Sequence, residues 1–298
     1  MFRSILVNNG ERITVRNEWL IIHQKDANKK IPLGDIQSLV VDNMSINLSV
    51  YALCKLAEYD INVILCDDKH LPCCNVLSSD SYYASFAALK RQIKLSKEVQ
   101  NNLWEKIVKA KIKNQAYVLE NLTGKSEISG RLHQLADEVL PGDPGNREAI
   151  AAKMFFRNLF GVDFTRFEDD VVNAAMNYGY AIIRSLVARS LCAHGYNCNL
   201  GIHHIGEGNP FNLADDFMEP FRPIIDYWIF EHNDELVDEL TSSNKLSLVG
   251  LCNTEVLLNK KRMRLYNAVD KCIASFTSAI NGKSVELLLL PDLEKYGK

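Results

Sequence analysis

The sequence predicts an α+β protein in two parts: a small β-rich N-terminal domain over residues 1–78, followed by a larger, all-α C-terminal domain over residues 79–298. Two observations support this fold class. In the first 80 residues, short β-branched or apolar runs are separated by polar and glycine-containing turns. Beyond the polar residues 78–81, apolar side chains recur at helical spacing in long segments. A chain of 298 residues is long enough to bury a core in each part.

Strands make up most of the expected N-terminal domain. Each is a short apolar run bounded by turn residues, such as those at residues 8–10 and 26–28. The strands are expected at residues 3–7, 12–15, 19–23, 30–33, 36–41, 62–66 and 71–76. A helix is expected at residues 48–58, between the last two strands and the rest.

The C-terminal domain is expected to be nearly all helical. Gly161, Gly195 and Gly282 stand where helices should end, as glycine commonly does. The predicted helices cover residues 83–122, 129–136, 147–160, 169–194, 215–240 and 254–280. We find no internal repeat and no low-complexity segment.

The composition is that of a globular protein, with 47% hydrophobic and 24% charged residues. Disordered and fibrous classes are excluded on this ground. No apolar run near residues 1–10 has the length of a signal peptide, and the apolar helix around residues 181–192 is interrupted by Arg184 and Arg189. We therefore expect a cytoplasmic protein with no membrane partner.

Eight cysteines are present, and in a cytoplasmic chain they should be reduced. Cys66, His70, Cys73 and Cys74 form one cluster, but adjacent cysteines without a second spaced pair fit a zinc site poorly. A half-buried strand that carries small thiols is the favoured interpretation.

Positive charge is concentrated in one segment, although the net charge is −3. Residues 90–113 contain eight basic side chains against Glu98 and Glu105, which leaves the rest of the chain at about −9. A localised basic stripe is typical of phosphate binding, and the alternative is a solvated helix face. The predicted contacts in this stripe are Lys90, Arg91, Lys94, Lys106, Lys109, Lys111 and Lys113. A second basic cluster, with the same predicted role, comprises Lys260, Lys261, Arg262 and Arg264.

Nucleotide-binding loops are excluded. Two Gly-Lys-Ser triads begin at Gly124 and Gly282, but Leu119 and Thr277 stand where a P-loop needs its first glycine. Gly206 and Gly208 begin a dinucleotide-like pattern that lacks its third glycine. ATP and NAD are therefore not expected ligands.

Two acidic segments could hold a metal ion. A loop with His203 and His204 leads into a helix that opens with Asp215, Asp216 and Glu219, whose carboxylates share one helix face. Imidazole and carboxylate are ligands for Mn²⁺ or Mg²⁺, but acids are also common in the first turn of any helix.

Glu148 is the acid of the second segment, and it falls on the apolar stripe of its helix, where an unpaired carboxylate is costly. A metal-ligand role explains this position. The alternative is a capping box with Gly145 as the N-cap.

Three stretches together resemble the integrase nuclease of the CRISPR adaptation module, over essentially the whole chain. Residues 145–149 resemble the first acidic motif of that family, and residues 173–180 its central helix. Residues 201–204 with residues 216–223 resemble its second metal motif. The overall appearance is that of the branch found in type II, single-effector systems.

The resemblance implies that Glu148, His204 and Glu219 are the catalytic metal ligands, with Mg²⁺ or Mn²⁺ as cofactor. His204 occupies the histidine position of the family motif. Many relatives carry Asp where this chain has Glu219, and Asp216 is the local competitor for that role.

The implied reaction is attack by the 3′-OH of a foreign DNA fragment on a phosphodiester at the edge of a CRISPR repeat. The helical domain would be catalytic, and the β-rich domain would form a homodimer. Two dimers would be bridged by the small second adaptation protein. A general metal-dependent DNA nuclease or junction resolvase in repair, and a non-catalytic DNA-binding scaffold, are the alternatives.

Overall fold

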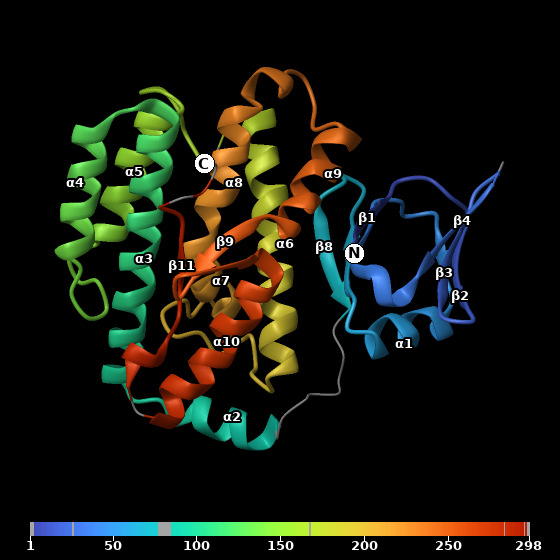
Figure 1. Cartoon of the computed structure of the whole chain (residues 1–298), viewed down its shortest axis with the longest axis horizontal. Coiled ribbons are helices and arrows are strands. Elements are labelled where there is room, and N and C mark those ends of the chain that lie inside the picture. Colours follow the sequence, from blue (N-terminus) through green and yellow to red (C-terminus); the bar gives the residue numbers. More distant parts are fainter. Residues whose placement is uncertain are drawn as a thin grey trace.

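The computed structural model describes residues 3–25, 27–76, 85–166, 168–282, 284–294 and 296. A β-rich N-terminal part lies beside a larger bundle of helices, which confirms the predicted α+β class (Figure 1). The predicted boundary at residue 78 lies outside the described residues.

The described N-terminal residues form two four-stranded sheets. The first has the order β1 (Arg3–Val7), β5 (Ile36–Val41), β7 (Asn62–Cys66) and β8 (Pro72–Val76), with β8 antiparallel to β7 and the other pairs parallel. The second has the order β4 (Asn28–Pro32), β3 (Trp19–His23), β2 (Arg12–Arg16) and β6 (Asn47–Leu48). The helix α1 (Val50–Glu58) completes the domain. Every strand and the helix predicted here are present, with ends shifted by at most two residues.

The helices of the C-terminal part lie in the predicted segments, but two predicted helices are divided and the one predicted to residue 240 ends at Glu231. The helix Ser242–Gly250 was not predicted, and the helix predicted from residue 254 begins at Leu265. The described helices are α2 (Ser85–Ile93), α3 (Lys97–Thr123), α4 (Ser126–Asp137), α5 (Arg147–Leu159), α6 (Val171–Ala193), α7 (Asn212–Met218), α8 (Arg222–Glu231), α9 (Ser242–Gly250) and α10 (Leu265–Gly282). The long helix predicted up to residue 122 is divided, because Ser96 caps a new helix by accepting the N–H of Val99. The helix predicted from residue 215 is divided by a 3₁₀ turn, Glu219–Phe221. Pro220 lies at the start of this turn and Pro223 at the start of α8, where a missing N–H costs nothing.

A small sheet interrupts the predicted helix at residues 254–280. Strands β9 (Glu255–Leu258) and β10 (Lys261–Arg264) form a hairpin, and β11 (Pro291–Asp292) pairs with β9. Asn259 and Lys260 both have positive φ, which is the backbone geometry of a two-residue hairpin turn. The basic cluster predicted at residues 260–264 therefore lies on a hairpin rather than on a helix.

One β-sheet contributes side chains to the hydrophobic cores of both parts. On the central strand β5, Leu39 and Val41 belong to the N-terminal core, whereas Val40 between them belongs to the C-terminal core. This follows from the two-residue side-chain repeat of a strand. A buried ion pair, Lys245 Nζ to Asp42 at 3.0 Å, also joins α9 to the end of β5.

The helix α6 forms the centre of the C-terminal core and packs against α7, α8, α9 and α10. Gly179 allows α8 to approach closely, since a Cβ there would lie 2.6 Å from Ile225. This contact places Tyr180 of α6 beside Asp226 of α8. In the part of the chain that the structure describes, no helix combines the length and the apolar character needed to cross a membrane.

The cysteine cluster of the N-terminal domain does not form a metal site among the described residues. Cys66 is buried, whereas Cys73 and Cys74 are exposed on β8. The Nδ1 of His70 lies 2.7 Å from Asp42. The interpretation as a half-buried strand carrying free thiols agrees with this arrangement.

Candidate metal and nucleic-acid site

Glu148 lies in the first turn of α5, and its carboxylate is free of any capping role. The N-cap is Asn146, with φ of 49° and no side-chain capping bond. Asp143 supplies the missing capping bonds, because its two carboxylate oxygens accept the N–H groups of Arg147 and Glu148, each at 2.9 Å. The alternative of a capping box with Gly145 is therefore wrong. The Glu148 carboxylate instead bonds to the ammonium of Lys111.

Glu219 lies in the 3₁₀ turn between α7 and α8, and its side chain is 7% exposed. Arg222 Nη1 lies 2.8 Å from one of its oxygens, and Lys111 Nζ lies 2.5 Å from the other. Burial raises the pKa of Glu219, but these two cations outweigh burial and lower that pKa to about 2. Glu219 is therefore an ionised carboxylate at depth.

Lys111 joins the two acids, which corrects its assignment to the DNA-binding stripe. Its side chain is 5% exposed, and its ammonium is paired with both Glu148 and Glu219. Lys111 stands four residues after Ile107 and three after Val108, so it falls on the buried stripe of α3. This position in the apolar pattern was the signal in the sequence that separates Lys111 from its solvent-facing neighbours.

Asp216 is fully buried and organises the histidine loop. It accepts the backbone N–H groups of Ile202 at 2.5 Å, His203 at 3.2 Å and His204 at 3.1 Å. His204 Nδ1 also lies 2.8 Å from this carboxylate. Because a carboxylate can only accept a hydrogen bond, Nδ1 carries the proton. Gly201 is required for this tight loop, since a Cβ there would lie 2.1 Å from the His204 carbonyl oxygen.

The bond from Nδ1 leaves Nε2 of His204 as the nitrogen able to bind a metal. The neighbouring His203 is occupied differently, because its ring stacks on Trp104 with centroids 4.1 Å apart. The oxygens of Asp216 are engaged with the loop, whereas Glu219 faces a cavity. Among the candidate side chains of this segment, the geometry thus favours His204 over His203 and Glu219 over Asp216.

Two cavities meet at these residues. His204 and Glu219 line one of about 490 Å³, and Glu148 and Lys111 line another of about 750 Å³. Tyr180 and Arg222 line both. Within the described ranges, no three His, Cys, Asp or Glu side chains are close enough to hold one metal ion. The structure therefore brings Glu148 and Glu219 together around one cation, and it leaves His204 in the adjoining cavity.

A cluster around Tyr180 was not predicted from the sequence. The Tyr180 hydroxyl bonds to the carboxylate of Asp226, and Arg222 lies over the Tyr180 ring at 4.1 Å, with Arg166 at 5.2 Å. Burial raises the pKa of Asp226 to about 6, against the lowering effect of Tyr180 and Arg222. Asp226 stands among the buried residues of α8. An acid at such a position needs a specific partner, and this was the feature of the sequence that could have predicted the cluster.

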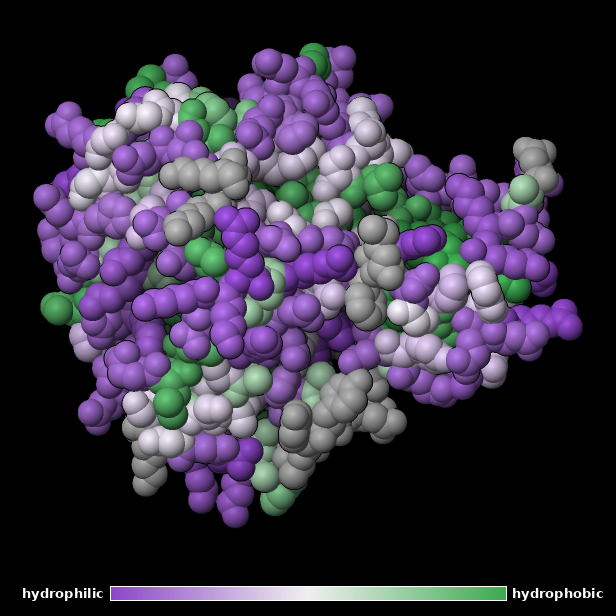
Figure 2. Space-filling view, viewed as in Figure 1, coloured by the Kyte–Doolittle hydropathy of each residue, from purple (hydrophilic) through white to green (hydrophobic). Residues whose placement is uncertain are grey.

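The predicted DNA-binding residues of α3, apart from Lys111, lie on a different face of the helix. Lys106, Lys109 and Lys113 line a groove of about 490 Å³ beside the segment that contains β11. Acids neighbour all three: Glu286 at 3.2 Å from Lys106, Glu105 at 2.5 Å from Lys109 and Asp137 at 3.8 Å from Lys113. Hydrophilic side chains cover most of the surface over α3 and α4 in Figure 2. Lys90 on α2 and Lys94 just after this helix are exposed, and Arg91 on α2 is half-buried.

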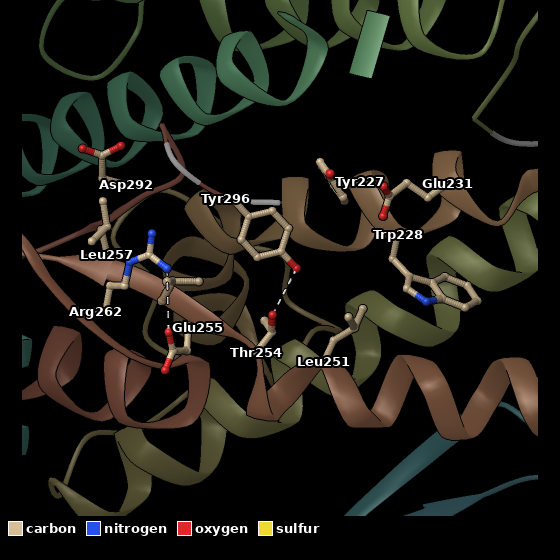
Figure 3. Close-up of a pocket in the computed structure, with 11 residues that line it drawn as sticks. Tyr227, Trp228, Glu231, Leu251, Thr254, Glu255, Leu257, Arg262, Asp292 and Tyr296 are labelled. Carbon is tan, nitrogen blue, oxygen red and sulfur yellow. Dashed lines mark hydrogen bonds and ion pairs between the residues drawn. The ribbon is translucent and has the colours of Figure 1, made fainter. Parts of the chain in front are cut away.

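The second basic cluster lies beside the pocket in Figure 3, between α8 and the small sheet. Lys260, Lys261 and Arg262 are exposed, and Arg264 is half-buried. Arg262 lies 4.0 Å from Glu255, and both side chains line the pocket together with Tyr296. This pocket contains none of the predicted metal ligands.

The fold is that of a class of known proteins. A casposase bound to its integration product has the same fold, with a TM-score of 0.79 and 18% identity over 99% of this chain and 94% of that one. A chain of a Cas6-RT-Cas1–Cas2 complex is also similar, with a TM-score of 0.72 and 18% identity over 96% of this chain and 36% of that one.

Sequence comparison gives the family. The family described as "CRISPR associated protein Cas1" matches residues 5–143 and 148–283. The CRISPR-associated endonuclease Cas1 of Neisseria meningitidis is 37% identical over 98% of this chain and 96% of that protein. The chain belongs to the Cas1 family of CRISPR-associated proteins.

Proposed function

We propose that this chain is a divalent-metal-dependent DNA integrase and endonuclease of CRISPR adaptation. In the reaction, the 3′-OH of a foreign DNA fragment attacks a phosphodiester at the edge of a CRISPR repeat. One phosphodiester bond forms as another breaks, so no ATP is needed. The observation that carries the proposal is the convergence of Glu148 and Glu219 on one positive charge at the junction of two cavities. The Neisseria relative is named an endonuclease, and the casposase was solved on an integration product.

The residues fit a Mg²⁺ or Mn²⁺ ion. Glu148 and Glu219 supply hard oxygen ligands, and the ammonium of Lys111 stands where such a cation would be held between them. His204 would add its Nε2 from the adjoining cavity. When bound, the ion would polarise the scissile phosphate and activate the attacking hydroxyl.

The surrounding side chains prepare the site. Asp216 fixes the tautomer and orientation of His204. Arg222 lines both cavities and is placed to bind a phosphate oxygen. The basic residues of α2, α3 and the β9–β10 hairpin would hold the DNA backbone, so that a bound 3′-OH reacts in preference to water.

The proposed partners are double-stranded DNA fragments, CRISPR repeat DNA, a second copy of this chain and the small second adaptation protein. A structurally similar chain was solved in an assembly with Cas2, which supports the last of these. We propose a homodimer formed through residues 1–78 and action in the cytoplasm.

The test is a joining assay with the small adaptation protein present. A labelled fragment with a 3′-OH, a matched fragment with a 3′-phosphate and a supercoiled repeat plasmid are incubated with Mn²⁺ or Mg²⁺, with and without chelator. We expect label transfer from the 3′-OH fragment alone, and with metal alone. Cutting without joining would favour a repair nuclease or junction resolvase, and DNA binding without either would favour a scaffold.

Variants connect this activity to the site. Substitution of a residue that only orients a metal ligand lowers metal affinity or activity by about 10–100-fold. Loss of a ligand itself should cost more, so Glu148→Gln, Glu219→Gln and His204→Ala should each reduce joining by at least about 100-fold. Glu127→Ala removes an exposed acid of α4 and should leave joining unchanged. Full activity in Glu148→Gln would exclude the proposed metal site.

A further inference from the structure

Lys111 occupies the position between the two acidic ligands, with an ammonium that contacts both Glu148 and Glu219. We propose that Lys111 is the internal counter-ion of the metal-free site, and that it must leave this position before a divalent cation can bind. The inference rests on the proposed metal-dependent function and adds a regulation of metal loading by the chain itself.

The need for a counter-ion follows from the burial of the two acids. Glu219 is 7% exposed and Glu148 is 28% exposed, and both face the same point in space. Two carboxylates so close together at this depth repel each other and lose hydration, which destabilises the fold unless a cation lies between them. Arg222 binds only the oxygen of Glu219 that Lys111 does not contact. Lys111 is therefore the cation that neutralises the facing pair.

The same site cannot hold Lys111 and a divalent ion together, because both need the same oxygens and repel each other. Metal binding must then displace the ammonium, and the cost of displacement reduces metal affinity. Lys111 acts in this sense as a competing ligand that is present at fixed, high local concentration.

The displaced ammonium has a second set of partners within reach. Gln115 stands four residues further along α3, so its side chain neighbours Lys111 on one helix face. Its Oε1 is buried and has no hydrogen-bond partner among the described residues. Gln115 and the buried carboxylate of Asp226 line the 750 Å³ cavity together with Lys111. A lysine that swings toward Gln115 would give this orphaned oxygen a donor and would free the acids for metal.

The decisive experiment measures Mn²⁺ binding to the full-length protein without DNA. Lys111→Met should bind Mn²⁺ about tenfold or more tightly than wild type. In this variant no ammonium has to be displaced from the two carboxylates, so the cost of displacement no longer reduces the affinity. Without metal, its melting temperature should be lower than that of wild type, and saturating Mn²⁺ should raise it by a larger increment. The matched control is Lys113→Met, which removes a lysine two residues away whose side chain is 44% exposed, and it should behave as wild type in both measurements.

Glu148→Gln separates the two proposals. If Mn²⁺ binding by the wild type does not depend on Glu148, the proposed metal site fails and the inference fails with it. If binding depends on Glu148 but Lys111→Met binds Mn²⁺ as wild type does, or more weakly, the metal site stands and the counter-ion role is overturned.

A second measurement uses the wild type and does not depend on the folding of a variant. Lys111 should resist an amine-acylating reagent in the metal-free protein, since its ammonium is buried and paired. Saturating Mn²⁺ should increase its acylation several-fold, whereas that of Lys113 should not change, as read by peptide mass spectrometry. Equal acylation of Lys111 with and without metal would contradict displacement.

Discussion

Single acids in the same short segment have different roles, and only part of this was visible in the sequence. Spacing placed Asp216 and Glu219 on one helix face, and the family motif favoured Glu219. The structure shows that Asp216 is held by three backbone N–H groups of the histidine loop. That loop returns across the helix start from residues 12 to 14 positions away, a contact that helical spacing cannot reveal. Lys111 was misjudged for the opposite reason, because its charge was counted but its position on the apolar stripe was not.

Asp216 should therefore contribute to stability as well as to metal affinity. Asp216→Asn places an amide where a carboxylate accepts four hydrogen bonds, and we expect the free energy of unfolding to fall by about 3 kcal/mol. Mn²⁺ affinity should fall by about 10–100-fold, because His204 loses its orienting partner. Urea denaturation followed by circular dichroism and Mn²⁺ titration measure the two effects.

Asp215→Asn is the control for this substitution. Asp215 is the preceding acid, with a side chain 21% exposed; it accepts one hydrogen bond, from Asn209 Nδ2 at 2.7 Å, and lies 3.9 Å from Arg184. Its substitution should cost less than about 1 kcal/mol. Equal destabilisation by the two variants would contradict the assigned role of Asp216.

At the scale of elements, the sequence pattern correctly predicted those strands and helices that depend on residues close together in the chain. The strands and α1 of the N-terminal domain were found within two residues, because alternation and turn residues lie next to each other in sequence. The β9–β10 hairpin was not predicted, since Asn259 and Lys260 adopt positive φ without a glycine to indicate it. The parallel pairing of β1 with β5 joins residues more than 30 positions apart, and no local pattern specifies such a partner.

Helix α3 has a buried face that carries Lys111 and a more exposed face that carries Lys106, Lys109 and Lys113, and the second face gives a prediction about DNA. The triple variant Lys106→Gln, Lys109→Gln and Lys113→Gln should weaken binding to duplex DNA of any sequence. Each lost phosphate contact should reduce the slope of log affinity against log salt by about 0.9. Fluorescence anisotropy over a salt series measures this slope.

The control for α3 removes the same charge elsewhere. Lys25, Lys29 and Lys30 are exposed residues around the β3–β4 turn, on the opposite side of the molecule from α3 (Figure 1). Their replacement by glutamine should leave the slope nearer to that of wild type. Identical slopes for wild type and the α3 variant would mean that these lysines form only a solvated helix face. Mn²⁺ binding without DNA should be the same in all three proteins.

At the scale of the whole molecule, the two parts predicted from the sequence are less separate than expected. The sheet that contains β5 and β7 contributes to both cores, and Asp42 and Lys245 form a buried pair between the parts. The change from strand to helix patterns was visible in the sequence. The packing of this sheet against the helices was not, because it depends on which face of the sheet meets α6, at β7 and β8, and α9, at β1.

The exposed apolar surface of the N-terminal domain leads to the last prediction, which concerns assembly. Met44, Val50 and Tyr51 are 70%, 76% and 57% exposed within a stretch of eight residues before and within the first turn of α1. Hydrophobic atoms also gather on this domain around β1, beside α9, in Figure 2. Large apolar side chains that are left in water together are typical of a protein interface. We therefore expect the full-length chain, of 33.7 kDa, to sediment as a dimer at micromolar concentration.

Two glutamates should disrupt this dimer without unfolding the chain. In Val50→Glu with Tyr51→Glu, charge enters the apolar surface, and because both side chains already face solvent the monomer should remain folded. Sedimentation velocity should show a monomer for this variant and a dimer for Val237→Glu, which changes a 70% exposed apolar residue of the helical part. If the wild type is monomeric, or if the double variant still dimerises, residues 1–78 do not supply the contact through α1. Joining should be lost with the dimer, because a reaction at both edges of one repeat needs two active sites held at a fixed separation, whereas Mn²⁺ binding by each monomer should persist.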